Sequence, residues 1–278
     1  MKRRSYIQMA IGLAVLLLLI ALWRIRNDRE QTDWKTHLDK DSLAPFGAAV
    51  TFQVLDPYFG QPMLLVEDSL IESLPLGRRD LNYIFLGDGL LMDTSAVNHL
   101  LQFVHSGNAA LLIAREFPQA LLAQLYEAGC HESIWFEMET FIDTTAFLQP
   151  IVEEPTLPRA VPVRHIRDRL PRYRRWSYLP DYFFCETVQA PIALGNQPGD
   201  FTNFARFTYG VGEIYLHTTP LAFSNFNMRE ERQLNYASWV FSHLPGDRNT
   251  YWDHFHQFDA DIVRNIEQDA ETDYSDQH

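Results

Sequence analysis

The chain has 278 residues, with 23 lysines and arginines against 36 aspartates and glutamates, which gives a formal net charge of −13 at pH 7. Its 46% hydrophobic residues, with 19 Phe, 12 Tyr and 6 Trp, supply a packed core and exclude a disordered chain. The acidic balance excludes nucleic acid as a partner, because such a surface repels phosphate backbones and bare anionic lipid alike.

Residues 6–23 form an apolar run in which Gln8 is the only strongly polar side chain. At about 1.5 Å per residue, a helix of this length spans roughly 27 Å, close to the ~30 Å thickness of a bilayer's hydrocarbon core. Tyr6 and Trp23 lie at its ends, where amphipathic rings favour the headgroup region. The run predicts a transmembrane helix after a basic tail of residues 1–5. A cleaved signal peptide is the alternative, but the run is long and lacks a good cleavage site.

Basic residues flank both ends of this run, so their distribution alone does not set the orientation. Short N-terminal tails mostly stay in the cytoplasm, whereas long domains are translocated largely regardless of charge. We therefore expect a single-pass protein of the cytoplasmic membrane, which contacts the bilayer through residues 6–23 and has its soluble domain on the extracytoplasmic side. Residues 24–36 are then a linker, residues 37–258 an α/β domain, and residues 259–278 an acidic, disordered tail.

The first half of the domain alternates between predicted helices and strands. Helices are expected from Asp41 or Ser42 to about residue 55, over residues 94–106 and over residues 118–128, and apolar strands over residues 82–86 and 109–114. Apolar strands separated by amphipathic helices are typical of βαβ units on a parallel sheet. The pattern predicts a flavodoxin-like three-layer α/β sandwich.

The second half is richer in proline and aromatic residues. Residues 190–194 are expected to form a strand, and residues 204–208 and 213–218 a hairpin around a glycine-containing turn. Asn227 with Glu230 resembles a capping box for a helix that ends near residue 244.

Several short segments together resemble a bacterial membrane-anchored family catalogued as domain of unknown function 4350. The resemblance covers roughly residues 37–251. The segments that carry it are Asp39-Lys40-Asp41-Ser42 before Pro45-Phe46-Gly47, Asn82-Tyr83-Ile84, residues 210–216, and Pro220-Leu221-Ala222-Phe223 with Asn225.

That family is similar in fold to class I glutamine amidotransferases, so the resemblance implies a class I glutamine amidotransferase-like three-layer sandwich. Its nucleophile would follow the strand of residues 109–114, where this chain has Arg115 and Glu116 and no cysteine or serine. His217 stands where that class would place its histidine, but no matching acid follows it. The resemblance thus implies a membrane-tethered, non-catalytic binding or scaffold module of a bacterial envelope system, beside other membrane proteins and an ATPase of the AAA+ type.

A concentration of arginines is the most unusual feature of the chain. Only Asp168 opposes them in this stretch. Guanidinium groups suit carboxylate or phosphate, so an anionic ligand, a lipid headgroup or an acidic partner is expected here. The alternative is that the chain's own acids neutralise a solvated loop. The arginines are Arg164, Arg167, Arg169, Arg172, Arg174 and Arg175.

Asp39 and Asp88 follow strands of the predicted sheet. Ligands of open α/β sheets bind at the carboxyl ends of strands, so both are candidate binding residues. Ordinary turn chemistry is the alternative. Cys130 is expected to be inert at a helix end, and the sequence leaves open whether it pairs with Cys185.

His254 and His256 are the candidate metal ligands. In an extended segment they would share one face, and zinc would need a third ligand such as His217 or His243. The alternative is exposed positions of an edge strand.

Two other functions therefore stand beside the binding module. One is a membrane-associated hydrolase or transferase that uses His217 with Asp39 or Asp88 as acid–base groups. The other is a metal-binding sensor. No cofactor is expected, and the sequence leaves the oligomeric state open.

Overall fold

The computed structural model describes residue 16 and residues 32–130, 138–151 and 159–258. The chain divides into two units, Met1–Asp33 and Trp34–His278, and the second contains every element discussed below. Within the described ranges, no helix is long and apolar enough to cross a bilayer, so the predicted transmembrane helix is not found there. Residues 6–23 themselves, except Leu16, lie outside the described residues, as do the predicted tails of residues 1–5 and 259–278.

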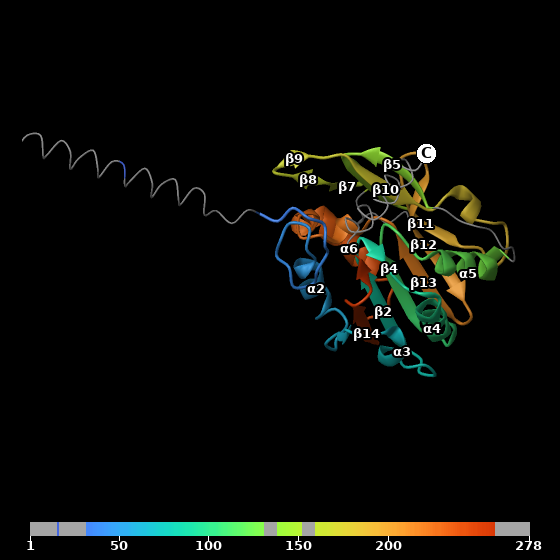
Figure 1. The fold of residues 1–278 in the computed structure, drawn as a ribbon. Helices are drawn as coiled ribbons and strands as arrows, with labels where there is room; N and C mark the ends of the chain where they lie inside the picture. Colours follow the sequence, from blue (N-terminus) through green and yellow to red (C-terminus); the bar gives the residue numbers. More distant parts are fainter. Residues whose placement is uncertain (1–15, 17–31, 131–137, 152–158, 259–278) are drawn as a thin grey trace, which may run out of the picture. The chain divides into compact units, whose positions relative to one another are not determined.

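A nine-stranded sheet forms the centre of the second unit (Figure 1). Its first five strands run parallel to one another, and each of the last four pairs antiparallel with its neighbours. In spatial order the strands are β1 (Leu64–Val66), β14 (Asn249–Asp253), β2 (Leu81–Leu86), β4 (Ala109–Ile113), β13 (Gly212–His217), β12 (Phe201–Tyr209), β11 (Ile192–Gln197), β6 (Thr145–Pro150) and β7 (Val161–Arg164).

The sheet is mixed, so the prediction of a flavodoxin-like or class I glutamine amidotransferase-like sandwich with a parallel sheet is wrong. The reason lies in the connections of the second half. Tyr209 pairs with Gly212, so a two-residue turn joins β12 to β13, and such a turn permits only antiparallel strands. Gly210 has a φ of 63°, which suits this tight turn. The hairpin itself, expected from the sequence, is confirmed.

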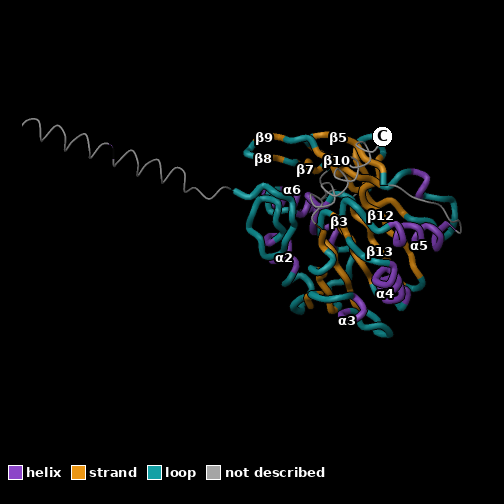
Figure 2. The backbone as a smooth tube through the Cα atoms, viewed as in Figure 1, coloured by secondary structure: helices purple, strands orange, loops and turns teal. Residues whose placement is uncertain are grey.

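Helices cover both sides of this sheet (Figure 2). The α-helices are α2 (Ala49–Leu55), α3 (Leu70–Ser73), α4 (Thr94–His105), α5 (Gln119–Cys130) and α6 (Glu231–Phe241), and the 3-10 helices are η1 (Asp181–Phe183), η2 (Pro220–Phe223) and η3 (Asn227–Arg229). Three small pairs of strands complete the unit: β5 (Glu139–Asp143) with β10 (Arg174–Tyr178), β3 (Gly89–Leu90) with β15 (Gln257–Phe258), and β8 (Ile166–Arg167) with β9 (Leu170–Pro171).

Strand β2 shows how the core forms on both faces of the sheet. Tyr83 and Phe85 belong to the hydrophobic cluster that also contains the buried residues of α4 and α5. Ile84 and Leu86 belong to the other cluster, with buried residues of α6. Because successive side chains of a strand point to opposite faces, a strand that is apolar throughout fills both clusters.

Two predicted helices begin later than expected. The first one starts at Ala49 as α2, after a series of turns. The last one starts at Glu231 as α6, because the side chain of Asn227 is bonded to the Arg164 and Leu221 carbonyls instead of capping that helix. By contrast, α4 begins as predicted, with the Asp93 carboxylate accepting the Ala96 N–H at 2.7 Å.

Candidate anion-binding site

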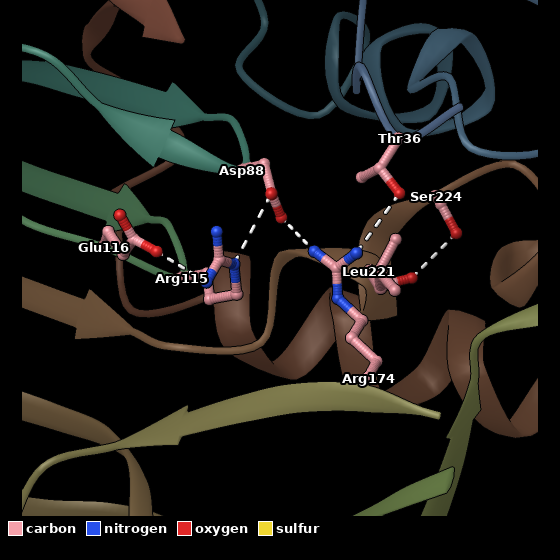
Figure 3. A network of polar contacts seen from close by, with 7 residues as sticks. All are labelled: Thr36, Asp88, Arg115, Glu116, Arg174, Leu221 and Ser224. Carbon is pink, nitrogen blue, oxygen red and sulfur yellow. Dashed lines mark hydrogen bonds and ion pairs between the residues drawn. The ribbon is translucent and has the colours of Figure 1, made fainter. Parts of the chain in front are cut away.

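An ion-pair network lies where β2 and β4 end, at the carboxyl edge of the parallel strands. Asp88 pairs with Arg174 of β10 and with Arg115, whose Nε is 3.4 Å from Asp88 Oδ2 (Figure 3). Arg115 Nη1 also lies 2.5 Å from Glu116 Oε1. Arg174 Nη1 donates to Thr36 Oγ1 at 3.3 Å, which fastens the start of the unit to the network.

This network assigns Asp88 a structural role. Its side chain is 5% exposed, and those of Arg115 and Arg174 are 12% and 13% exposed, so water screens the three charges only weakly. The carboxylate accepts hydrogen bonds from both guanidinium groups, so each of its oxygens already has a protein partner.

Asp39 forms a turn at another place. Its Oδ1 accepts the Asp41 N–H at 2.8 Å, and its carbonyl accepts the N–H groups of Ser42 and Ala48. These bonds are the turn chemistry that the sequence left as the alternative. Asp39 and Asp88 are thus each engaged with different partners and do not act as a carboxylate pair.

Five of the six clustered arginines remain unpaired. Arg164, Arg167, Arg169, Arg172 and Arg175 are exposed, and none of them forms an ion pair with a residue that the structure describes. We call these five residues the arginine surface. Among the described residues, neutralisation by the chain's own acids, which the sequence left as the alternative, is observed for Arg174 and for none of these five.

A pocket of about 700 Å³ lies beside this surface, and Arg164 and Arg169 of the surface line it. Arg229 lines the pocket as well. It was not predicted from the sequence, because a single arginine between a methionine and a glutamate does not indicate a binding site. The described residues that line it include no carboxylate and are Trp34, Leu43, Pro45, Arg164, Ile166, Arg169, Pro171, Asn225, Phe226 and Arg229.

Local contacts hold the pocket arginines in place. Arg229 Nε donates to the Phe226 carbonyl at 2.8 Å, and its guanidinium lies 4.0 Å from the Phe226 ring centroid. Asn227 Oδ1 accepts the Arg164 N–H at 3.0 Å, and its Nδ2 donates to the Arg164 carbonyl at 3.2 Å. The Asn227 amide thus pairs with the backbone of Arg164 as a neighbouring strand would.

Asn225 holds a wall of the same pocket. Its Nδ2 donates to the carbonyls of Ser42 and Ala44, at 2.7 and 2.8 Å. Its Oδ1 accepts the Val50 N–H at 2.9 Å. Because Leu43 stands between the two carbonyls, these bonds fix the position of the Leu43 wall before any ligand binds. Asn225 is therefore a positioning residue.

The hairpin of β8 and β9 carries part of the arginine surface on a tight turn. Asp168 and Arg169 adopt φ angles of 54° and 67° at its tip, as a two-residue hairpin turn requires. Nearby His165 adds no positive charge at neutral pH. Burial, followed by the charge of Arg174, lowers the pKa of His165 to about 4.

His217, the proposed acid–base group of the enzyme alternative, is fully buried. Its Nδ1 accepts the Thr219 N–H at 3.1 Å, so its Nε2 carries the proton and faces Tyr236 Oη at 2.9 Å. A histidine that acts as a general base usually donates its Nδ1–H to a carboxylate, which orients the ring. In His217, Nδ1 carries no proton and cannot form this bond.

Acid should weaken the fold through His217. Burial lowers the pKa of His217 from 6.5 to about 3, so the unfolded chain binds the extra proton between these values. The fold has its full stability above pH 6.5 and loses stability as the pH falls toward 3. The loss in the free energy of unfolding is about 2 kcal/mol at pH 5. Urea unfolding at pH 5 and pH 7 should show a shallower acid dependence for His217→Gln. Equal dependence in both proteins would contradict this assignment.

The two candidate metal ligands do not share a strand face. Strand β14 ends at Asp253, whose Oδ1 accepts the N–H groups of Phe255 and His256 and so bends the chain. His256 Nδ1 lies 2.8 Å from Asp253 Oδ2, whereas His254 Nδ1 is buried without a hydrogen bond. Among the described residues, no three metal-binding side chains gather.

Cys130 and Cys185 form a disulfide, which answers the question that the sequence left open. Their Cα atoms are 5.7 Å apart, and the bond joins the end of α5 to the segment after η1. Neither sulfur is therefore available as a thiol nucleophile.

Comparison with known proteins adds little to this geometry. No family model matches the chain and no curated protein matches it, so the resemblance to domain of unknown function 4350 stays a prediction. Similar solved structures include a β-galactosidase from Bacillus circulans sp. alkalophilus, with 10% identity and a TM-score of 0.35 over 64% of this chain and 23% of that one. Another is the exo-β-1,4-mannosidase Op5Man5 from Opitutaceae bacterium strain TAV5, with 14% identity and a TM-score of 0.38 over 84% and 39%.

The chain thus spans less than half the length of either glycosidase. The correction of the glutamine amidotransferase-like fold class predicted from the sequence rests on the mixed sheet described above. At these TM-scores, the likenesses carry no argument about activity.

Proposed function

We propose that this chain is a non-catalytic binding module that recognises an anionic ligand at the pocket of Arg164, Arg169 and Arg229. One observation carries the proposal: three arginines without a carboxylate among the lining residues share a pocket, in a chain whose net charge is −13.

The charge distribution supports this function physically. An acidic protein repels anions over most of its surface, so an anion that approaches is attracted only where positive charge is concentrated. Guanidinium groups that form no ion pair with a described residue can form charge-assisted hydrogen bonds with an incoming ligand.

The state of the candidate catalytic groups favours binding over catalysis. His217 is buried with both ring nitrogens in hydrogen-bond contact with protein groups, and Asp88 is neutralised by two arginines. Neither offers a free acid–base group to a substrate. The tether at a bacterial cytoplasmic membrane through residues 6–23, and a membrane-protein partner there, remain predictions of the sequence.

Anion binding by the purified full chain tests the proposal. The probes are a fluorescein-labelled polyglutamate peptide and inorganic pyrophosphate, titrated at low and at moderate salt. We expect saturable binding that weakens with salt and falls about tenfold or more in the variant Arg164→Gln/Arg169→Gln/Arg229→Gln.

Arg79→Gln is the matched control, because Arg79 is also exposed, is not ion-paired with a described residue and does not line the pocket. The control should bind both probes as the unmodified chain does, and circular dichroism should show that all variants are folded. A triple variant that binds as tightly as the unmodified chain would overturn the proposal.

A further inference from the structure

We infer that the pocket takes a phosphate ester, with the phosphate on Arg164, Arg169 and Arg229 and an apolar substituent against Trp34 and Phe226. This inference rests on the proposed function and gives its ligand a chemical class.

The charge of the pocket favours phosphate over carboxylate. Three arginines line a space that has no acid among its described lining residues. A single carboxylate would leave two of these charges uncompensated. A phosphate monoester has a charge of about −1.5 to −2 at neutral pH and three acceptor oxygens, so it can engage several guanidinium groups at once.

Arg229 is oriented for such a group. Its Nε is bonded to the Phe226 carbonyl, and its plane lies over the Phe226 ring. Both Nη groups therefore stay available, in a plane that the protein has already fixed. A guanidinium edge held in this way forms paired hydrogen bonds with two phosphate oxygens at little cost in conformational entropy.

The apolar walls of the pocket indicate that the ligand has an apolar part in addition to its phosphate. Six of the ten lining residues are Trp34, Leu43, Pro45, Ile166, Pro171 and Phe226. A volume of about 700 Å³ falls within the range of pockets for whole small molecules, roughly 300 to 1,000 Å³. Leu43 is 79% exposed, so part of the apolar wall is open to solvent. The ligand should thus carry an apolar arm next to its phosphate.

The structure also indicates that the site binds without reacting. None of the lining residues that the structure describes is a serine, cysteine, histidine, aspartate or glutamate. The Asn225 side-chain amide forms hydrogen bonds through both its nitrogen and its oxygen with backbone groups of residues 42–50, so it supports the wall and does not contact the ligand.

Two sources share the inferred chemistry: a soluble organic phosphate and the phosphate headgroup of a lipid.

Calorimetry on the full chain tests the inference with four probes: naphthyl phosphate, naphthoate, naphthalene dicarboxylate and inorganic phosphate. We expect naphthyl phosphate to bind about tenfold more tightly than each of the other three. Arg229→Gln should weaken naphthyl phosphate and inorganic phosphate alike. Trp34→Ala should weaken naphthyl phosphate but leave inorganic phosphate unchanged, and Arg79→Gln should change neither.

The outcomes separate this inference from the proposed function. If the dicarboxylate binds as tightly as naphthyl phosphate and both depend on the three arginines, the phosphate assignment is overturned and the anion-binding function stands. If none of the four probes binds and the polyglutamate peptide does not bind either, both the phosphate inference and the anion-binding function are overturned. Displacement of naphthyl phosphate by dihexanoyl phosphatidic acid and by glycerol 3-phosphate then identifies the source: a lipid if the former is stronger, a soluble phosphate if the latter is.

Discussion

Replacing Asp253 with alanine is expected to destabilise the fold by about 4 kcal/mol, the largest effect of any single change considered. Asp253 is completely buried at the end of β14. Its carboxylate accepts from Tyr83 Oη and from His256 Nδ1, and it also accepts the N–H groups of Phe255 and His256 at 2.9 and 3.0 Å. Alanine removes all four bonds and leaves buried donors without partners.

The tyrosine cannot compensate for this loss. Burial and the neighbouring Asp253 raise the pKa of Tyr83 well above its usual value, so its hydroxyl stays protonated and must donate. Without the carboxylate, no acceptor replaces it at that position. The Asp253→Asn variant should fall between the two proteins, because its Oδ1 still accepts backbone N–H groups.

Urea unfolding at neutral pH measures this effect. Asp247→Ala serves as the control, because Asp247 is exposed and its replacement should change the free energy of unfolding by less than about 0.5 kcal/mol. A loss of under about 1 kcal/mol for Asp253→Ala would show that the buried carboxylate does not organise this end of the sheet.

Replacing Asp88 with alanine should cost about 3 kcal/mol, because it leaves two largely buried arginines without their shared counter-ion. Arg115 retains Glu116 as a partner, whereas Arg174 loses its ion pair with Asp88. Adding Arg174→Met to Asp88→Ala removes the guanidinium that has lost this carboxylate and should restore part of the lost stability.

A double-mutant cycle over Asp88 and Arg174 measures their coupling from four unfolding curves. We expect a coupling free energy of more than about 1 kcal/mol. Additive effects of the two changes would contradict the ion pair. The folded fraction of each variant should still bind naphthyl phosphate, since neither residue lines the pocket.

Local pattern was enough to predict several elements of the first half. The strand predicted over residues 82–86 is observed as β2, and the strand over 109–114 as β4, because each is a short apolar run between turn signals. The hairpin of β12 and β13 was also predicted, because its glycine-containing turn is a local signal. The direction of the other strands was not predictable in this way. Whether a strand is parallel to its neighbour depends on which segments meet in space, and local periodicity does not contain that information.

The residues of the candidate site likewise include some that local sequence predicts and some that only the tertiary fold reveals. Arg164 and Arg169 stood out because charge of one sign is concentrated in a short segment. Arg229 lies 229 − 169 = 60 positions beyond Arg169, and only the tertiary fold brings it to the same pocket. The partner of Arg174 was equally hidden, since Asp88 precedes it by 86 positions. Sequence reasoning thus named both members of that ion pair as ligand contacts without recognising that they bind each other.

The position of β14 constrains how this protein is made. That strand inserts between β1 and β2, although the ribosome synthesises it last among the nine. Until residue 253 has emerged, one edge of β2 is unpaired and β1, whose sheet neighbour is β14 alone, has no strand to join. Completion of the sheet must therefore wait until residue 253 has emerged, and during that interval the open edge of β2 exposes a nascent molecule to aggregation or to capture by a chaperone.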